Sequence, residues 1–210
     1  MTAPVGTEFD PGLLGTRCWL ERPGGDRVEL PVHRWRGAVS PGDELLLDTC
    51  AGPTVDIGCG PGRLTTALTS RGIPALGIDT SPVAVRLTRA RGGAALRRDV
   101  FDRLPGEGRW SHALLADGNI GIGGDPVTLL RRVTSLLAPG GTVVADIDPP
   151  GTGLRRDRVR LRPASGAAAR WFPWAWLGAD AVAEVATRAG LRLSRLDHDH
   201  HRWVVALARR

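Results

Sequence analysis

The sequence predicts an α/β fold in which a mainly parallel β-sheet is covered by helices on both faces. Short apolar runs of β type alternate with segments of helical length from about residue 43 to the end of the chain. Several of these runs end in glycine-containing turns or at an aspartate. Such alternation is typical of a parallel sheet whose crossover connections are helices. At 210 residues the chain can bury such a core without disulfides or metal.

Five apolar runs are the predicted parallel strands. They lie at 54–57, 75–78, 94–98, 112–116 and 142–147. The helices predicted between them lie at 63–71, 82–90 and 126–137. Ser81-Pro82 and Asp125-Pro126 each place a capping side chain before a proline in the first helical turn. Gly72 suits the left-handed residue that ends a helix. We expect right-handed crossovers throughout.

The two ends of the chain and one long insertion differ from this pattern. A helix at about 180–189 leads to two apolar runs, 191–196 and 203–208, and the short connection between them predicts an antiparallel hairpin. Residues 1–42 are rich in Gly, Pro and Arg, with one strand-like stretch at 27–35, and are predicted to form a lid or edge extension. The main domain is then residues 43–210, with a substrate-side insertion at about 149–178.

The composition of the chain favours a cytoplasmic enzyme. The three cysteines, Cys18, Cys50 and Cys59, are odd in number and scattered, which fits a reducing compartment. No run approaches the roughly 18 apolar residues that would span a bilayer, so we expect no membrane insertion. All 28 basic residues are arginine, a sign of GC-rich coding, so the net charge of +6 is weak support for a nucleic-acid partner.

A glycine-rich turn follows the first predicted strand. Gly58, Gly60 and Gly62 lie between that buried strand and a helix, where the backbone can approach a ligand beside the free N–H groups of the helix. The dinucleotide fingerprint requires glycine three residues after Gly60, but Arg63 occupies that position. A nicotinamide-dependent dehydrogenase is therefore a weaker interpretation.

The spacing Asp56-x-Gly58-x-Gly60-x-Gly62 resembles motif I of the class I (Rossmann-like) S-adenosylmethionine-dependent methyltransferases. Further landmarks of that family follow in order. An acid at the end of the second strand, Asp79, lies 19 residues after Gly60; Asp99-Val100 follows the third strand; and residues 137–141 resemble the turn before the fifth strand. The resemblance covers roughly residues 43–148. It implies a three-layer fold with seven strands, the last of them antiparallel.

The resemblance also implies a binding site for S-adenosylmethionine (SAM) and roles for individual residues. Asp56 would lie near the methionine end, and Gly58 and Gly60 would let the backbone approach the cofactor closely. Asp79 would accept hydrogen bonds from the ribose hydroxyls, and Asp99 would contact the nitrogens of the adenine. The full set of residues expected to bind the cofactor is Asp56, Gly58, Cys59, Gly60, Asp79, Thr80, Asp99, Val100, Asp117 and Gly118. A carboxylate at a strand exit can instead cap a turn, which is the structural alternative for Asp56 and Asp79.

The segment Asp117–Asp125 is unusually rich in glycine for this position in the family. We expect it to contact the methionine end of the cofactor, with Gly118, Gly121, Gly123 and Gly124 permitting close approach or left-handed turns. Asn119 offers donors and an acceptor. The alternative is a long turn in which Asp125 caps the next helix.

The catalytic residue cannot be chosen from the sequence. If the methyl group goes to a hydroxyl or an ammonium group, a general base must remove a proton from that group. The candidates for this base are His33, Asp117, Asp148, His198, His200 and His201. The run from Asp197 to His201 is interpreted as a solvated hairpin tip rather than a metal site. Asp148-Pro149-Pro150 resembles part of the D-P-P-Y signature of amino methyltransferases that act on DNA or glutamine. It follows the fifth strand rather than the fourth, so it is interpreted as a turn.

Two further clusters lie in the insertion. Arg158, Arg160 and Arg162 share one face of a predicted strand, interpreted as solvated, although it could bind an acidic acceptor. The aromatic residues are predicted to pack in the core, or else to form a substrate wall, and they are Trp171, Phe172, Trp174 and Trp176.

The sequence therefore predicts a SAM-dependent methyltransferase that acts on a small-molecule acceptor. Residues 1–42, 117–125 and 149–178 are expected to determine which acceptor is used. The alternatives are a catalytically silent SAM-binding module and an RNA or DNA methyltransferase.

Overall fold

The larger of the two sheets carries the predicted α/β architecture. A computed structural model describes residues 7–199 and 202–209. The large sheet has the strand order β10-β11-β7-β6-β3-β4-β5. Its strands are β3 (Thr54–Ile57), β4 (Ala75–Asp79), β5 (Ala95–Arg97), β6 (Trp110–Leu115), β7 (Leu137–Ile147), β10 (Leu191–His198) and β11 (Trp203–Arg209). The neighbours from β5 to β7 pair in parallel, whereas β11 is antiparallel to both β7 and β10. The predicted fold class and the terminal hairpin are confirmed.

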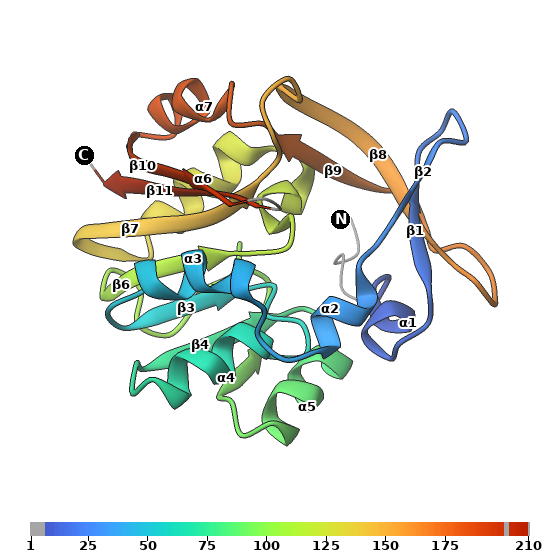
Figure 1. The fold of residues 1–210 in the computed structure, drawn as a ribbon, viewed down its shortest axis with the longest axis horizontal. Coiled ribbons are helices and arrows are strands. Elements are labelled where there is room, and N and C mark those ends of the chain that lie inside the picture. Colours follow the sequence, from blue (N-terminus) through green and yellow to red (C-terminus); the bar gives the residue numbers. More distant parts are fainter. Residues whose placement is uncertain (1–6, 200–201, 210) are drawn as a thin grey trace.

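Helices cover both faces of this sheet (Figure 1). They are α3 (Pro41–Thr49), α4 (Arg63–Ser70), α5 (Pro82–Ala90), α6 (Pro126–Thr134) and α7 (Val182–Arg188). Leu114 and Val144 pack with α3 and α4 on one face, while their neighbours Leu115 and Ala145 pack with α6 and α7 on the other. This alternation follows from the period of two along a strand. The predicted caps form, since Ser81 accepts from Val83 and Ala84 N–H groups and Asp125 accepts from Val127 N–H.

A second, smaller sheet joins the N-terminal segment to the insertion. Its order is β2-β1-β8-β9, formed by β1 (Cys18–Glu21), β2 (Arg27–Glu29), β8 (Leu154–Pro163) and β9 (Phe172–Leu177). All its pairings are antiparallel. Two short helices, α1 (Asp10–Leu13) and α2 (Val32–Arg36), lie between it and the large sheet (Figure 1). Segments predicted as two separate additions therefore form one structural unit.

The arginine stripe of β8 is partly neutralised inside this small sheet. Glu21 on the neighbouring strand accepts from Arg160 Nε at 2.5 Å and from Arg162 Nε at 3.0 Å, and it also pairs with Arg27. These guanidinium groups lower the pKa of Glu21 to about 2. Arg158 instead donates to the Trp171 carbonyl. Arg160 and Arg162 are therefore held by an acid rather than presented as free cations.

Two sequence predictions need correction. Residues 27–35 are not one strand, because β2 ends at Glu29 and helix α2 begins at Val32 after Pro31. Residues 137–141 do not only form a turn. Strand β7 begins at Leu137, opposite Trp110, and the pairing resumes at Thr142 opposite His112 after a register shift. The extra residues between these two pairs form a bulge at the start of the strand.

A 3₁₀ segment after β6 connects the two sheets. This segment, η1 (Asn119–Gly124), packs against β9. A Cβ on Gly121 would lie 2.2 Å from the Ala175 carbonyl oxygen, and one on Gly124 would lie 2.7 Å from Pro173. Gly118, Gly123 and Gly124 have positive φ angles. The predicted left-handed turns and close approach are therefore present, but the close approach is to β9.

Replacing Gly121 by alanine should weaken this junction. The added methyl group would collide with the backbone of β9, so we expect the free energy of unfolding to fall by about 1–3 kcal/mol, the usual cost of overpacking. Urea denaturation measures this change. Gly24→Ala is the matched control, because a Cβ there meets nothing within 4 Å and the residue has no positive φ. Equal stability of the two variants would contradict the account of the junction.

Candidate active site

One cavity of about 680 Å³ lies between the two sheets. Its floor is formed by the carboxyl ends of β3, β4, β6 and β7, and its far wall by the small sheet with α1 and α2. All the residues predicted to bind the cofactor line it, namely Asp56, Gly58, Cys59, Gly60, Asp79, Thr80, Asp99, Val100, Asp117 and Gly118. The volume falls within the range of about 300–1,000 Å³ that is usual for ligand pockets.

The glycine turn is held in place by Asn119. Gly58, Gly60 and Gly62 have φ angles of 70°, 54° and 82°, in the left-handed region that favours glycine. The Asn119 amide donates to the carbonyls of Ile57 and Gly58, both at 2.9 Å. A Cβ on Gly58 would lie 2.6 Å from that amide nitrogen. Asn119 was predicted as a possible ligand contact; its amide group positions the turn, and the residue also lines the cavity.

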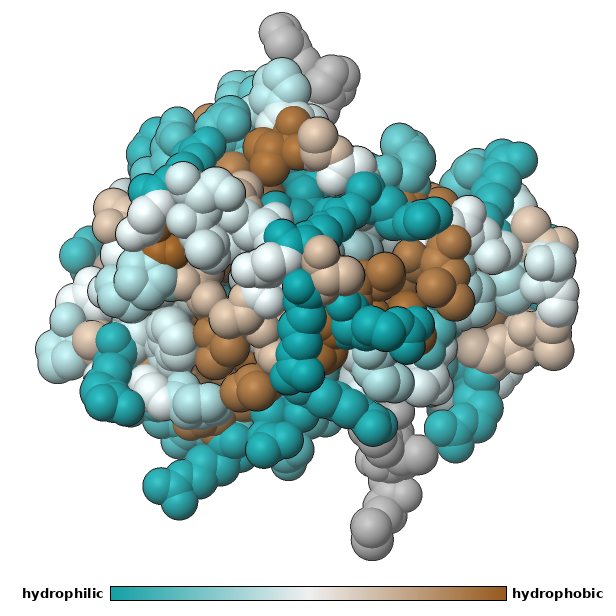
Figure 2. Space-filling model, turned by 90° about the horizontal axis from the view of Figure 1, so that it is seen from below, coloured by the Kyte–Doolittle hydropathy of each residue, from teal (hydrophilic) through white to brown (hydrophobic). Residues whose placement is uncertain are grey.

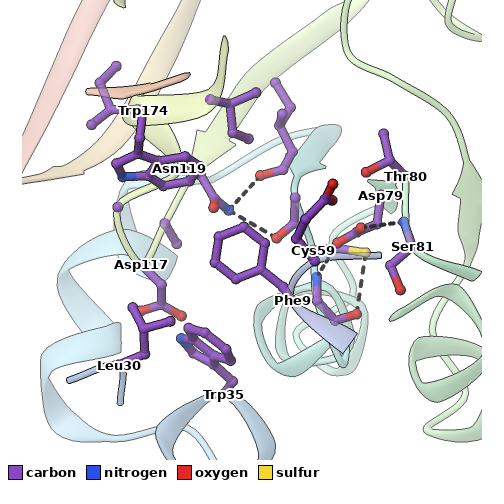
Figure 3. A pocket seen from close by; sticks show the side chains of 18 of the residues that line it. Phe9, Leu30, Trp35, Cys59, Asp79, Thr80, Ser81, Asp117, Asn119 and Trp174 are labelled. Atoms are coloured by element: carbon purple, nitrogen blue, oxygen red, sulfur yellow. Dashed lines mark hydrogen bonds between the residues drawn. The ribbon is translucent and has the colours of Figure 1, made fainter. Parts of the chain in front are cut away.

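Asp79 is oriented by two backbone donors. Gly60 N–H donates to its Oδ2 at 3.0 Å and Ser81 N–H donates to its Oδ1 at 2.8 Å. Burial raises the pKa of Asp79, and these two hydrogen bonds oppose the shift. The carboxylate thus links the glycine turn to the start of α5 while facing the cavity (Figure 3).

Asp99 and Val100 lie at the next strand end along the sheet. Phe101 N–H donates to Asp99 Oδ1 at 3.0 Å, so this carboxylate caps a local turn as well as lining the cavity. The Val100 side chain is buried. The strand-exit acids therefore have structural partners, as the alternative interpretation expected, and all remain at the cavity wall.

Asp56 is enclosed more deeply than the other acids. The residue is 2% exposed, and its carboxylate accepts from Thr65 Oγ1 at 2.6 Å. Burial raises its pKa to about 6. Because the folded state then binds a proton that the unfolded state releases above pH 4, stability should fall as the pH rises from about 4 to 6.

An Asp56→Asn variant should remove this pH dependence. Asparagine has the same shape and can still accept from Thr65, but it does not titrate. Relative to wild type, the variant should gain stability from pH 4 to pH 6, reaching about 3 kcal/mol at pH 7, as the shift of about two pKa units implies. Urea denaturation of both proteins between pH 4 and 7 tests it. A constant difference between them would contradict the raised pKa.

Buried ion pairs connect the glycine helix, the N-terminal segment and two strand ends. This Arg–Asp cluster consists of Arg34, Asp43, Arg63, Asp117, Asp146 and Arg202. Asp117 is its centre, with contacts of 2.6 Å to Arg34, 2.5 Å to Arg63 and 2.6 Å to Arg202. In the sequence, Arg63 is distinguished only as the residue that replaces a glycine of the dinucleotide fingerprint. Asp117 was predicted to contact the methionine end, and its carboxylate is held by three guanidinium groups.

Aromatic side chains form the part of the cavity away from Asp79. The Phe9 ring lies 6.2 Å from Trp35, 5.6 Å from Phe172 and 5.7 Å from Trp174, measured between centroids. In Figure 3, Phe9 lies between Trp35, Leu30 and Trp174 on one side and Cys59 and Asp79 on the other. Phe172 and Trp174 therefore both pack in the small-sheet core and line the cavity. Phe9 and Trp35 were missed, because their roles depend on the folding of the N-terminal segment.

The face seen in Figure 2 differs from this cavity lining. There, hydrophobic side chains form separate patches between hydrophilic ones rather than one continuous surface. The aromatic side chains that line the cavity come from parts of the chain that are distant in sequence: the segment before α1, α2, the loop after β5, and β9 with the residue before it. Their convergence indicates a binding chamber.

The histidines considered as proton acceptors are not part of the described cavity wall. His33 lies in α2 and His198 stacks on Trp203 with ring centroids 4.5 Å apart, and neither lines the cavity. His200 and His201 lie outside the described residues. Of the candidates, Asp117 and Asp148 do line it.

Within residues 7–199 and 202–209, no group of three or more His, Cys, Asp or Glu side chains is arranged to hold a metal ion. Over the same residues, every helix is too short or too polar to cross a bilayer.

Comparison with known proteins identifies the large-sheet domain. Residues 54–141 match the family model described as "Methyltransferase domain". A trans-aconitate 2-methyltransferase of Paracidovorax citrulli is 32% identical over 128 residues, which are 53% of this chain and 49% of that protein. The chain spans about half the length of the curated relatives it matches.

Solved structures share the fold over more of the chain. A SAM-dependent methyltransferase from Bacteroides fragilis, crystallised with S-adenosylhomocysteine (SAH), superposes with a TM-score of 0.79 over 98% of this chain and 97% of that chain, at 20% identity. The 1,6-didemethyltoxoflavin-N1-methyltransferase of Burkholderia thailandensis superposes with a TM-score of 0.63 over 85% and 81% of the two chains, at 19% identity. The family match shows a methyltransferase domain at residues 54–141, and the solved structures and the strand order of the large sheet confirm the predicted class I methyltransferase fold.

Proposed function

We propose that this protein binds SAM and transfers its methyl group to a small-molecule acceptor. One observation carries the proposal: the ten residues predicted to bind the cofactor converge on a single cavity, which continues to an aromatic wall. A silent binding module would be expected to close the acceptor side. Here the cavity extends past Phe9 to Phe172 and Trp174, which favours an enzyme.

The cofactor half of the cavity fits an adenosine-containing ligand. The carboxylates of Asp99 and Asp79 lie at the ends of neighbouring strands β5 and β4. Adenine and ribose are adjacent in the ligand, so they could lie next to Asp99 and Asp79, respectively. The glycine turn presents backbone without side chains at the end of β3. Beyond it, a Cβ on Gly118 would meet nothing within 4 Å, which leaves open space where the methionine end would lie. Arg34 and Arg63 line this end of the cavity, and both are cluster arginines.

The chemistry needs mainly correct positioning. SAM, when bound, supplies an activated methyl group. The protein has to hold the acceptor atom in line with the sulfur–methyl bond, and such alignment can contribute up to about 7–11 kcal/mol in the best intramolecular cases. We infer that the small sheet, together with α1 and α2, holds the acceptor and excludes water. In this proposal residues 1–42 and the insertion at 149–178 act together as the lid.

Supporting observations come from relatives and from the cysteines. The similar proteins include enzymes named for small-molecule acceptors, among them the Burkholderia enzyme crystallised with its acceptor and SAH. Cys18, Cys50 and Cys59 are all buried free thiols. A reducing, cytoplasmic environment is therefore part of the proposal.

Calorimetric titration tests the cofactor directly. The purified protein should bind SAM and SAH saturably with one site per chain, whereas NAD should give no saturable heat. Binding of NAD with no binding of SAM or SAH would reject the proposal. The glycine turn would then have to serve a dinucleotide despite Arg63.

A further inference from the structure

We propose that the acceptor is a flat, largely apolar aromatic molecule carrying a hydroxyl or amino group, and that the Asp148 carboxylate takes the proton released on methylation. This inference rests on the proposed function and deepens it by naming the acceptor class and the catalytic residue. It follows from three features of the cavity: its rings, the contacts that engage its arginines and the position of Asp148.

The acceptor end of the cavity is built from rings and aliphatic side chains. Phe9, Trp35, Phe172 and Trp174 approach one another with centroid distances of 5.6–6.2 Å, in tilted and edge-to-face arrangements. Further apolar residues complete this wall, namely Leu20, Leu30 and Ile122. Rings at such distances and angles stabilise an aromatic guest by apolar burial and by ring–ring geometry.

The arginines of the cavity are largely engaged with other groups. Arg34 and Arg63 belong to the Arg–Asp cluster, where Asp117 contacts both. Arg158 donates to the Trp171 carbonyl, Arg98 donates to the Arg97 carbonyl beside Asp99, and Arg170 is 73% exposed and 3.8 Å from Glu8. An acceptor with several carboxylates would bury charges against rings, at a cost of several kcal/mol for each ion that Arg158 or the exposed Arg170 does not pair. The cavity thus disfavours trans-aconitate, although relatives that match half of this chain are named for it.

Asp148 lies at the strand end where the acceptor should meet the methyl group. Along the strand order β5-β4-β3-β6-β7, the cavity acids Asp99, Asp79 and Asp117 follow β5, β4 and β6. Asp148 follows β7, one strand further, and neighbouring strands are about 4.8 Å apart. A ligand with its adenine at Asp99 and its methionine end near Asp117 would leave its methyl group facing this next strand end.

The backbone of Asp148 is fixed by both sheets. Its N–H donates to the Leu177 carbonyl at 2.9 Å, and its carbonyl accepts from Ala179 N–H at 3.0 Å, next to the bridge between Asp148 and Gly178. The aspartate is thereby held between β7 and the end of β9. Such fixed backbone contacts give a proton acceptor a defined position.

The other cavity acids are less suited to receive a proton. Asp56 is enclosed with Thr65, Asp79 accepts two backbone N–H groups, and the side chains of Asp117 and Asp146 contact cluster arginines. Asp99 accepts from Phe101 N–H, Glu29 pairs with Arg17, and Glu8 lies 3.8 Å from Arg170. Asp148 forms no ion pair with any residue of 7–199 or 202–209. Burial raises the pKa of Asp148, a backbone hydrogen bond with Leu177 opposes the shift, and the negative charge of Asp148 in turn raises the pKa of Asp146. These features suit general-base catalysis.

The acceptor oxygen or nitrogen forms a bond to the methyl carbon while the carbon–sulfur bond breaks and its electron pair stays on sulfur. The O–H or N–H bond of the acceptor breaks, and the proton passes to the Asp148 carboxylate. Solvent later removes it. The products are the methylated acceptor, the thioether and one proton.

Acceptor binding is tested on protein saturated with SAH. 2-Naphthol and 2-naphthylamine represent the proposed class, and trans-aconitate represents the polycarboxylates. Calorimetry should give at least tenfold tighter binding of the naphthalene probes than of trans-aconitate. Tighter binding of trans-aconitate, or no binding of either naphthalene probe, would overturn the inference. Failure of SAH itself to bind would instead overturn the proposed cofactor, and the inference with it.

Variants locate the two parts of the proposed site. Trp174→Leu should weaken 2-naphthol binding at least tenfold and leave SAH binding within about threefold. Trp19→Leu is the matched control, because Trp19 lies outside the cavity wall and stacks with Arg17. Equal losses in both variants would contradict the assigned ring wall.

Asp148→Asn separates catalysis from binding. The variant should keep the dissociation constants of SAH and 2-naphthol within about threefold, while the single-turnover rate of methyl transfer to 2-naphthol falls about 100-fold, as loss of a general base typically requires. Mass spectrometry of the methylated product measures that rate. An unchanged rate would remove Asp148 from the mechanism. Asp26→Asn, an exposed acid in the β1–β2 turn, serves as the control.

Discussion

Asp79→Ala should reduce the affinity for SAH by about 100-fold. The carboxylate is expected to accept both ribose hydroxyls, and hydrogen bonds to a charged group each contribute about 1.5–3 kcal/mol. The variant also loses the contacts that tie Gly60 and Ser81 to this side chain. Calorimetric titration of wild type and variant measures the change. Circular dichroism verifies that the variant is folded.

Asp79→Asn and Asp26→Ala complete this test. Asparagine keeps one acceptor oxygen at position 79, so its affinity for SAH should lie between those of wild type and Asp79→Ala. Asp26 is an exposed acid paired with Arg22, and its replacement should leave SAH binding unchanged. An affinity for SAH that is the same in wild type and Asp79→Ala would remove Asp79 from the ribose site.

The second large effect is expected for stability. Arg202→Met should lower the free energy of unfolding by about 3–5 kcal/mol, because removing one partner of buried ion pairs leaves charge without compensation. The Arg202 side chain is 3% exposed and contacts Asp43, Asp117 and Asp146. Methionine fills a similar volume, so the loss reports on charge more than on packing. Urea denaturation at pH 7 measures it.

Arg71→Met is the matched control for Arg202. Arg71 also contacts two acids, Glu44 and Asp48, but its side chain and theirs are a third or more exposed. Exposed ion pairs contribute about 0–1 kcal/mol, so this variant should be nearly as stable as wild type. Equal destabilisation by the two substitutions would mean that burial does not increase the contribution of the Arg–Asp cluster to the free energy of unfolding.

The large sheet could be predicted because its signals are local. A buried run followed by Gly58, Gly60 and Gly62, and then by a helix, fixes the order strand, turn, helix within a few residues. Proline after a capping residue marked the starts of α5 and α6 correctly. The acids at the strand ends could be placed together because the carboxyl ends of parallel strands meet at one edge of a sheet.

The small sheet and the Arg–Asp cluster could not be predicted in this way. β1 pairs with β8 across more than a hundred residues of sequence, and no local pattern specifies that pairing. Asp117 contacts Arg34 and Arg202, which lie 83 and 85 residues away. The stretch 27–35 was expected to be one strand, and Pro31, followed by the α2 residues, ended it instead. Contacts of this kind depend on tertiary structure.

Phe9 illustrates the same limit at the candidate site. Nothing in its local sequence distinguishes it from an ordinary apolar residue of a Gly- and Pro-rich segment. It lines the cavity because α1 packs near the glycine turn, where a Cβ on Gly60 would lie 3.6 Å from Leu13. Asp10 also accepts from Ser81 Oγ at 2.5 Å, which ties this segment to the start of α5.

Hydrogen–deuterium exchange with and without SAH tests the central claim most directly. If the ligand lies across the carboxyl ends of β5, β4, β3 and β6, SAH should slow exchange at residues 58–62, 79–81, 99–101 and 117–121. The strands β10 and β11 should be unaffected, because they lie on the far side of β7 in the sheet. Slower exchange at all four segments is the predicted result. Binding of SAH without protection at 58–62 and 79–81 would contradict the account.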